Sequence, residues 1–429
     1  MRAYGILLAL VAGLLLGIAS ASVGGGWVDR AISIADSVGG MWLNALRMTV
    51  IPLVVSLLIT GIAASAQAAR ASRVAGRALF LFILLLWISS ALGAVLTLVF
   101  LQVWKMPAGA ADALRSAFTA TEAAPAVPGL GEFARAMIPT NPIAAAANDA
   151  ILPLIVFTTL FAFALTRVSM EGRERLTAFF RALADVMLVM IGWVLWLAPV
   201  GVLALAYVLG ARAGGAAFGA LVHYIIIVSG VGLVLWLLAY PLAVFGGRVS
   251  LRAFARAVLP AQSVAISTQS SLASLPAMLR GAEAVGVPVA TAGMILALAV
   301  AIFRITSPAM NVAVVLYVAH LLGVHLGALQ IATAVAVAAI TTLGSVSLPG
   351  QISFVASISP IAMAVGVPVE PLLLLVAVEN IPDIMRTFGN VTMDVAATAM
   401  IARRSGYGSA EEAGVKVASQ GPHEVPQDS

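Results

Sequence analysis

The sequence predicts an all-α membrane protein with several bilayer-spanning helices, and both its composition and the shape of its apolar runs indicate this class. Of its 429 residues, 62% are hydrophobic and only 10% are charged, which is far more apolar than a soluble domain. The apolar runs are long and continuous rather than alternating, so a β-barrel is excluded. The length accommodates about eight spans of about 20 residues with their connections.

Charge and cysteine content exclude several other classes. The net charge of +5 reflects arginines in membrane-flanking loops, and we expect no nucleic-acid partner. Cysteine is absent, so disulfides, thiolate catalysis and zinc–thiolate sites are excluded together. The sequence shows no nucleophile–base pair or metal cluster, so we do not expect an enzyme.

Six apolar runs precede a change of pattern after Arg256. The first run also has the form of a signal peptide, but the arginines farther along favour a first span with its N-terminus inside. Arginine clusters follow the second, fourth and sixth runs, which places both termini in the cytoplasm by the positive-inside rule. The expected spans are Ile6–Ile18, Met41–Ala64, Leu79–Val103, Asn148–Thr166, Ala178–Leu209 and Ala216–Ala243.

Two polar stretches lie outside these runs. Residues 106–137 are rich in Ala, Pro and Gly and predict a long external loop. The polar tail from Ser405 to Ser429 predicts a disordered cytoplasmic segment.

After Arg256, two apolar segments are each interrupted by a short polar tip, at 267–276 and 344–350. Neither half is long enough to span alone, and broken backbone at membrane depth is tolerated only where it lines a cavity or is buried in protein. We therefore expect two re-entrant helical hairpins. Pro276 and Pro349 suit the first turn of each second half-helix, whose N-terminus attracts anions. The alternative for either tip alone is a serine-rich kink in an ordinary span.

Between the hairpins lies a seventh segment, Ala290–Leu322, interrupted at 303–308. Pro308 removes one helix hydrogen bond and predicts a break in the turn before it.

The last apolar segment, Leu372–Met400, carries six polar side chains on one narrow stripe at the helical step of about 100° per residue. An ionised side chain at mid-membrane costs about 2.5 to 3.5 kcal/mol on insertion scales. We therefore expect the stripe to face the protein interior and bind a ligand, with internal ion pairs between helices as the alternative. Its residues are Glu379, Asp383, Arg386, Thr387, Asn390 and Asp394.

The two hairpins, the broken seventh segment and the stretch Asp383–Asp394 together resemble the dicarboxylate/amino acid:cation symporter family, the glutamate transporter homologues. The resemblance covers nearly the whole chain and implies an elevator-type fold of eight transmembrane helices and two re-entrant hairpins. It implies a scaffold mainly in 1–255, whose third and sixth spans move with a core transport domain at 256–403, before the cytoplasmic tail at 404–429. A homotrimer in the bacterial inner membrane, in contact with lipid, is also implied.

The family's binding residues carry over by position. In relatives, the counterpart of Arg386 holds the substrate's side-chain carboxylate and that of Asp383 holds its amino group, which agrees with guanidinium–carboxylate pairing. Thr387 and Asn390 complete the pocket. Main-chain groups near two hairpin tips are expected to cradle the α-carboxylate, with Ser307 of the seventh segment beside them. These tip positions are Ser270, Ser271 and Leu348.

The chain departs from the family at its sodium ligands. The family's NMDGT sequence falls on Phe303–Ser307, so Ile305 replaces a ligating aspartate and Arg304 adds a fixed cation. Asn390 and Asp394 remain from a degraded sodium site, and hard cations need several oxygen ligands. We therefore expect altered cation coupling that is wholly or partly sodium-independent, with Arg304 as a cation mimic. The alternative is that Arg304 faces a loop or the trimer scaffold and that sodium uses other ligands.

Glu379 and Pro382 raise two further expectations. Glu379 is a candidate proton acceptor, with a structural ion pair or an interface-facing carboxylate as equal alternatives. Pro382 should perturb the last helix by freeing the carbonyl of Val378.

These features predict a secondary active transporter of aspartate or glutamate, with no cofactor and with sodium or a proton as coupling ion. A C4-dicarboxylate carrier is the alternative in the same class, and a ligand sensor without transport is the alternative from another. Asp383 disfavours the dicarboxylate carrier, since a substrate without an amino group leaves that carboxylate unpaired. His223, His320 and His325 lack metal-ligand spacing and are expected to be packing or interfacial residues.

Overall fold

The computed structural model describes residues 2–71, 73–106, 135, 137–148, 150–214, 216–344 and 350–405, and every regular element within them is a helix. The expected loop at 106–137 and tail at 405–429 lie almost wholly outside these residues, as does the hairpin tip at 345–349. Within them, five helices are long and apolar enough to cross a membrane. These are Gly26–Gln67, Arg73–Val103, Met170–Trp196, Phe218–Gly246 and Val289–Leu322.

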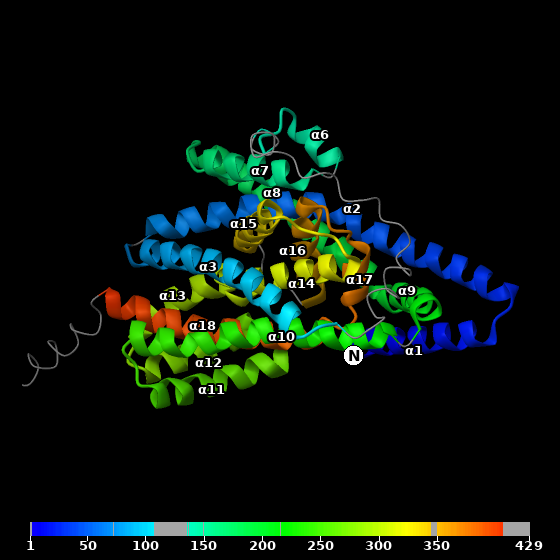
Figure 1. Cartoon of the computed structure of the whole chain (residues 1–429). Coiled ribbons are helices and arrows are strands. Elements are labelled where there is room, and N and C mark those ends of the chain that lie inside the picture. Colours follow the sequence, from blue (N-terminus) through cyan, green and yellow to red (C-terminus); the bar gives the residue numbers. More distant parts are fainter. Residues whose placement is uncertain are drawn as a thin grey trace, which may run out of the picture.

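The first helix, α1 (Arg2–Val23), packs along α9 (Ala198–Ala213), and small residues permit this contact (Figure 1). A Cβ added at Gly17 would lie 2.2 Å from the Tyr207 carbonyl oxygen, and one added at Gly210 would lie 2.3 Å from the Leu14 carbonyl oxygen. Close backbone approach through glycine is the usual means of packing membrane helices, because lipid provides no hydrophobic drive for their association.

A second group of helices surrounds α2 (Gly26–Ala71), which packs against α7 (Ile151–Leu165) and α8 (Met170–Trp196). The short α6 (Pro142–Ala147) precedes α7. The Trp42 side chain joins α2 to α8, because its Nε1–H donates to the Val194 carbonyl at 2.9 Å.

The structure corrects the expected fifth span, 178–209, which is not one helix. The helix ends at Trp196, and α9 begins at Ala198 with Pro199 in its first turn. A proline suits the start of a helix, where its missing N–H has no helical acceptor, and disrupts a helix interior. The chain therefore divides at Leu197.

The first hairpin consists of α11 (Leu251–Thr268) and α12 (Ser271–Ala284), which pack against each other. Gln269 adopts φ 51°, and the Ser270 hydroxyl caps α12 by accepting from the Ala273 N–H at 3.2 Å. Because this cap starts the helix at Ser271, Pro276 lies inside α12. The expectation that Pro276 occupies the first turn is wrong.

The break in the seventh segment is confirmed. It separates α13 (Val289–Ile302) from α14 (Thr306–Leu322), and Pro308 lies in the first turn of α14. The Ser89 hydroxyl of α3 (Arg73–Val103) donates to the buried carbonyl of Ile305 and so ties α3 to the break. Such internal hydrogen bonds suit irregular backbone at membrane depth, where no water is present to replace them.

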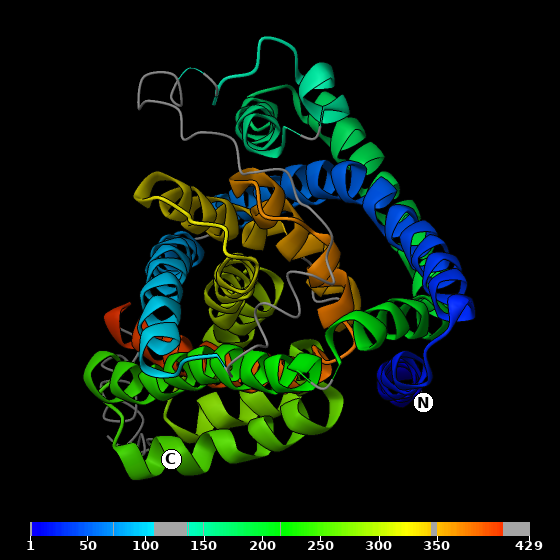
Figure 2. The same ribbon diagram turned by 45° about the vertical axis from the view of Figure 1, so that its right-hand side comes forward.

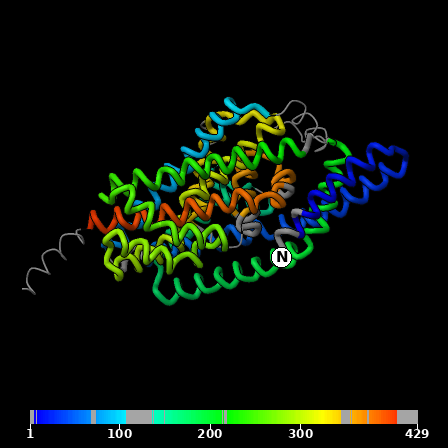
Figure 3. Tube along the Cα trace, turned by 90° about the horizontal axis from the view of Figure 1, so that it is seen from below, coloured from blue at the N-terminus to red at the C-terminus, as the bar shows by residue number. Residues whose placement is uncertain are grey.

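The remaining helices complete the C-terminal half. The second hairpin pairs α15 (Ala328–Gly344) with α16 (Gly350–Val365), and the short α17 (Glu370–Leu375) precedes α18 (Asn380–Arg404). α18 packs along α10 (Ala216–Pro241), which continues into the π-helical turn η1 (Leu242–Gly246) (Figure 3). Figure 2 shows α14 between the first hairpin on one side and α7 on the other.

Pro382 does not disturb α18 as expected. It lies in the first helical turn, where its missing N–H has no partner to lose. The Val378 carbonyl accepts from the Ile381 N–H at 3.2 Å, so it is not left free.

Candidate functional site

The polar stripe of α18 faces the protein interior along its full length. Glu379 is 0% exposed, and Arg386 is 2% exposed. All six of its side chains are buried, namely Glu379, Asp383, Arg386, Thr387, Asn390 and Asp394.

Arg386 lies at the centre of the stripe and pairs with two carboxylates through one nitrogen. Its Nη1 lies 2.5 Å from Glu379 Oε1 and 2.8 Å from Asp383 Oδ1. Among the described residues, Arg386 Nε and Nη2 have no hydrogen-bond partner. A buried donor without a partner costs about 1–3 kcal/mol, and more when charged. Internal ion pairing therefore satisfies Nη1 but leaves Nε and Nη2 of this guanidinium without acceptors among the described residues.

Glu379 is anchored from a second helix. The Tyr224 hydroxyl of α10 donates to Glu379 Oε2 at 2.8 Å, so each carboxylate oxygen has a partner. The expectation of an interface-facing carboxylate is wrong, because Glu379 is fully buried in an ion pair. Sequence reasoning assigned no role to Tyr224, which is separated from Glu379 by 155 positions.

Asn390 connects α18 to the break in the seventh segment. Its Oδ1 accepts from the Thr306 N–H at 2.9 Å and from the Thr306 hydroxyl at 2.8 Å. The same hydroxyl lies 2.8 Å from the Arg386 carbonyl oxygen. Gly389 permits this approach, since an added Cβ would lie 2.5 Å from Thr306 Cγ2. Thr306, which sequence reasoning also missed, therefore holds the first turn of α14 against the stripe.

The break in the seventh segment carries a cation, Arg304, between two apolar side chains. Phe303 and Ile305 are buried, and the Phe303 ring stacks on Phe82 with centroids 4.3 Å apart. Arg304 is 8% exposed and is electrostatically coupled to Asp383 and Asp394. Arg304 is therefore buried and does not face an exposed loop.

Few side-chain oxygens beside the break are available to a sodium ion. Asp394 Oδ1 and Ser307 Oγ are buried without hydrogen-bond partners among the described residues. Asn390 Oδ1 already accepts from Thr306, and the neighbouring Phe303 and Ile305 side chains are apolar. Because hard cations need several oxygen ligands, a sodium ion held here would have to draw on main-chain carbonyls as well.

The remaining expected binding residues lie on the first hairpin and beyond the described part of the chain. Both α11 and α12 pack against α18, and Gln262 Nε2 of α11 donates to Thr392 Oγ1 at 2.9 Å. Ser271 is buried at the start of α12, whereas the Ser270 hydroxyl is used as the helix cap. Leu348 falls outside the described residues.

The histidines form no metal centre within the described residues, where no group of three or more His, Cys, Asp or Glu side chains comes together. His223 is buried, with Nδ1 3.1 Å from the Tyr317 hydroxyl and Nε2 3.0 Å from the Trp104 carbonyl. His325 is exposed.

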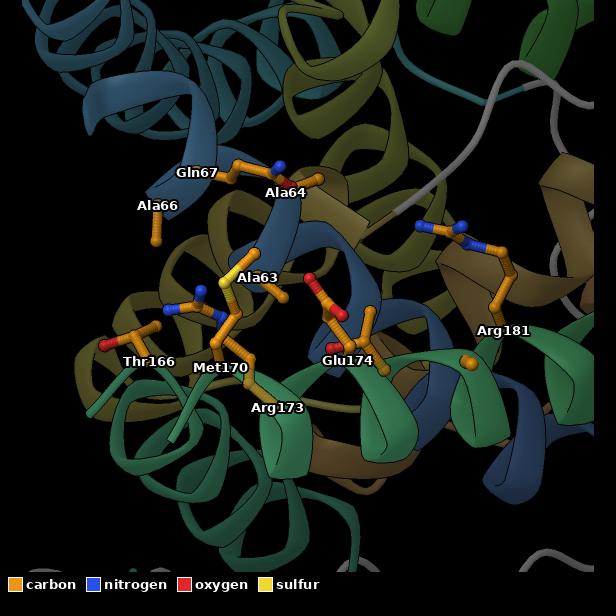
Figure 4. A pocket seen from close by; sticks show the side chains of 11 residues that line it. Ala63, Ala64, Ala66, Gln67, Thr166, Met170, Arg173, Glu174 and Arg181 are labelled. Carbon is orange, nitrogen blue, oxygen red and sulfur yellow. The ribbon is translucent and has the colours of Figure 1, made fainter. Parts of the chain in front are cut away.

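A separate cavity of about 340 Å³ lies between α2 and α8, away from the α18 stripe. Gln67 of α2 and the α8 residues Arg173, Glu174 and Arg181 are among the side chains that line it (Figure 4). It contains no residue of the stripe.

Long apolar helices around a buried ionic stripe, a broken helix and a helical hairpin are features of a polytopic membrane protein. Residues 3–404 match the sodium:dicarboxylate symporter family, and the chain belongs to this family of membrane transporters.

Relatives along nearly the whole chain differ in their named substrates. The proton/glutamate-aspartate symporter of Escherichia coli is 27% identical, covering 94% of this chain and 92% of the relative. The neutral amino acid transporter B(0) of Homo sapiens is 28% identical, covering 90% and 77%. C4-dicarboxylate transport protein 2 of Ralstonia nicotianae is 25% identical, covering 92% and 87%.

Proposed function

We propose that this transporter carries acidic amino acids such as aspartate and glutamate. The observation that carries the proposal is the unpartnered edge of Arg386, formed by Nε and Nη2 within the described residues. Two parallel N–H groups on one edge of a guanidinium match the geometry of a carboxylate. The substrate's side-chain carboxylate binds this edge without displacing Glu379 or Asp383 from Nη1.

Asp383 supplies the partner for the substrate's ammonium group. It lies one helical turn before Arg386 on the same buried face. A C4-dicarboxylate would place no cation against Asp383, so that substrate is disfavoured. A neutral amino acid would use Asp383 but leave the open edge of Arg386 unpaired.

We assign the α-carboxylate to the N-terminus of α12 and to two serines, one at this end and one at the start of α14. Backbone N–H groups at a helix N-terminus carry partial positive charge, and α12 packs against α18. Ser271 lies at this end, and Ser307 contributes a buried hydroxyl without a partner among the described residues. Thr387 and Asn390 complete the pocket.

Arg304 takes the place of a coupling metal ion in this proposal. It supplies a permanent positive charge near Asp394, where relatives with an aspartate in place of Ile305 gather ligands. A tethered cation cannot dissociate inside the cell, so it stabilises the site without drawing on a sodium gradient. Coupling then depends on protons or on exchange.

The core helices α14 and α18 contact α3 and α10, which supports a transport unit that includes the third and sixth spans. The elevator movement of this unit and a homotrimeric assembly belong to the same proposal.

Uptake into proteoliposomes tests the function. A panel of labelled acidic, neutral and amine-free substrates is supplied while sodium, proton and potassium gradients are varied independently. Saturable accumulation or exchange of aspartate or glutamate is expected. Saturable binding with neither accumulation nor exchange would instead assign the chain to the ligand-sensor alternative.

A further inference from the structure

The buried charges of the site do not balance when an acidic amino acid enters. The buried residues include three carboxylates, Glu379, Asp383 and Asp394, and two guanidiniums, those of Arg304 and Arg386, so the ionised site already has one excess negative charge. Aspartate or glutamate adds two carboxylates and one ammonium, and thus a second excess negative charge. Uncompensated charge away from water is strongly unfavourable, so substrate binding requires another positive charge.

The hydrogen bonds of Arg386 show which of its two carboxylate partners loses charge compensation when substrate binds. Glu379 and Asp383 share Nη1, and the substrate's carboxylate is assigned to the opposite edge. Asp383 gains the substrate's ammonium as a new partner. Glu379 gains nothing and becomes one of three carboxylates around a single guanidinium.

The surroundings of Glu379 suit a group that changes its protonation state. Its Oε2 is bonded to the Tyr224 hydroxyl, which can donate to a carboxylate or accept from a carboxylic acid. The Tyr224–Glu379 hydrogen bond is therefore kept in both states. Oε1 accepts from Arg386 in either state, so protonation leaves no oxygen of Glu379 without a partner.

We propose that Glu379 is the proton-carrying residue of this transporter, taking one proton from water when an acidic amino acid binds and returning it when the substrate leaves. The proton adds to a carboxylate oxygen of Glu379, and no other bond forms or breaks. This inference rests on the proposed function, because the charge imbalance arises only with a substrate of net negative charge.

The other titratable groups of the site, and of the ring cluster beside Tyr224, come from three helices and the break before α14. Asp383, Arg386 and Asp394 lie on α18, Tyr224 and His223 on α10, and Tyr317 on α14, while Arg304 lies at the break. His223 bonds to Tyr317, whose ring packs on that of Tyr224 with centroids 5.3 Å apart. Among the described residues, the side-chain hydrogen-bond partners of Glu379 are Arg386 and Tyr224. His223 is the competing candidate and needs its own variant.

The test measures aspartate binding to the purified full-length protein from pH 5.5 to 8.5 in sodium-free choline buffer. Wild type is expected to bind tightly at low pH, where Glu379 takes up a proton, and to weaken by up to about tenfold per pH unit as pH rises. Glu379→Gln mimics the protonated acid, so its affinity should stay within a few-fold of the wild-type low-pH value throughout. A wild-type pH slope that persists in Glu379→Gln overturns the proposal.

Two control variants separate Glu379 from other groups. Glu370→Gln removes a carboxylate with a similar partner, Arg47 at 2.5 Å, but on α17 and half exposed. It should retain the wild-type slope. His223→Gln should retain the slope as well. Loss of the slope in His223→Gln alone would identify His223 as the proton carrier and overturn the proposal.

A measurement on wild type keeps the inference testable if Glu379→Gln does not fold. Adding aspartate to the protein in weakly buffered solution near neutral pH, with a pH indicator, should remove close to one proton per bound aspartate from solution. Binding without proton uptake at any pH contradicts the role of Glu379. Absence of aspartate binding at every pH instead contradicts the proposed function.

Discussion

The α1–α9 contact and the α14–α18 contact are both close crossings of membrane helices, but they differ in what holds them. In the first, Gly17 and Gly210 bring backbones together, and the nearest atoms to an added Cβ at either glycine are main-chain atoms. In the second, Gly389 permits the approach, but Thr306 and Asn390 fix it through hydrogen bonds. The comparison shows that the α1–α9 contact only packs two helices together. The α14–α18 contact instead positions buried charged groups, and some of their hydrogen-bonding atoms have no partner without a ligand.

Removing the Arg386 guanidinium, at the α14–α18 contact, should weaken substrate binding more than the other changes below. Arg386→Ala leaves Glu379 and Asp383 without their shared partner and removes the carboxylate-binding edge. We expect acidic amino acids to lose about 3–5 kcal/mol of binding free energy, and neutral amino acids much less. Arg386→Lys is the matched control, which keeps the charge but loses the planar fork. Aspartate binding within a few-fold of wild type in Arg386→Ala would show that the pocket is assigned wrongly.

Asp383→Asn, at the same helix contact, should weaken the binding of substrates with an ammonium group more than that of substrates without one. It removes the carboxylate that pairs with an ammonium group, so aspartate should weaken by at least about tenfold, or 1.4 kcal/mol. Succinate, which has no ammonium group, should change much less. Competition of both compounds against labelled aspartate measures the difference. Equal losses for the two compounds would assign Asp383 a structural role.

A methyl group added at the α1–α9 contact should lower the stability of the protein without changing its ligand selectivity. In Gly17→Ala the new Cβ would meet the Tyr207 carbonyl, and overpacking of this kind costs about 1–3 kcal/mol. Gly40→Ala is the matched control, because its Cβ would meet no atom within 4 Å. Thermal unfolding in detergent should distinguish the two variants, while the remaining folded Gly17→Ala protein keeps the wild-type preference for aspartate over succinate. A Gly17→Ala protein as stable as Gly40→Ala would contradict the close crossing.

The sequence was most informative where periodicity within one segment decides the structure. The spacing of Asp383, Arg386 and Asn390 was sufficient to predict one face of α18, and Pro308 was sufficient to predict the break before α14. In both cases the relevant residues lie within a few turns of each other, so helical geometry alone relates them.

Features that depend on partners far apart in the chain were not predictable in this way. Tyr224 meets Glu379, and Thr306 meets Asn390, only because α10 and α14 pack on α18. Competition between local signals explains other differences. The Ser270 cap moved the start of α12 ahead of Pro276, and Pro199 divided an apolar run that looked continuous.

The proposed function requires that substrate binding does not depend on a bound sodium ion, because the Arg304 side chain supplies the positive charge instead. A titration of aspartate affinity against sodium, from none to high concentration at constant pH and with choline holding the ionic strength constant, examines this requirement. We predict affinities within about twofold across the titration, and loss of binding in Arg304→Met through an uncompensated Asp394. A wild-type affinity that rises steeply with sodium would contradict the proposal.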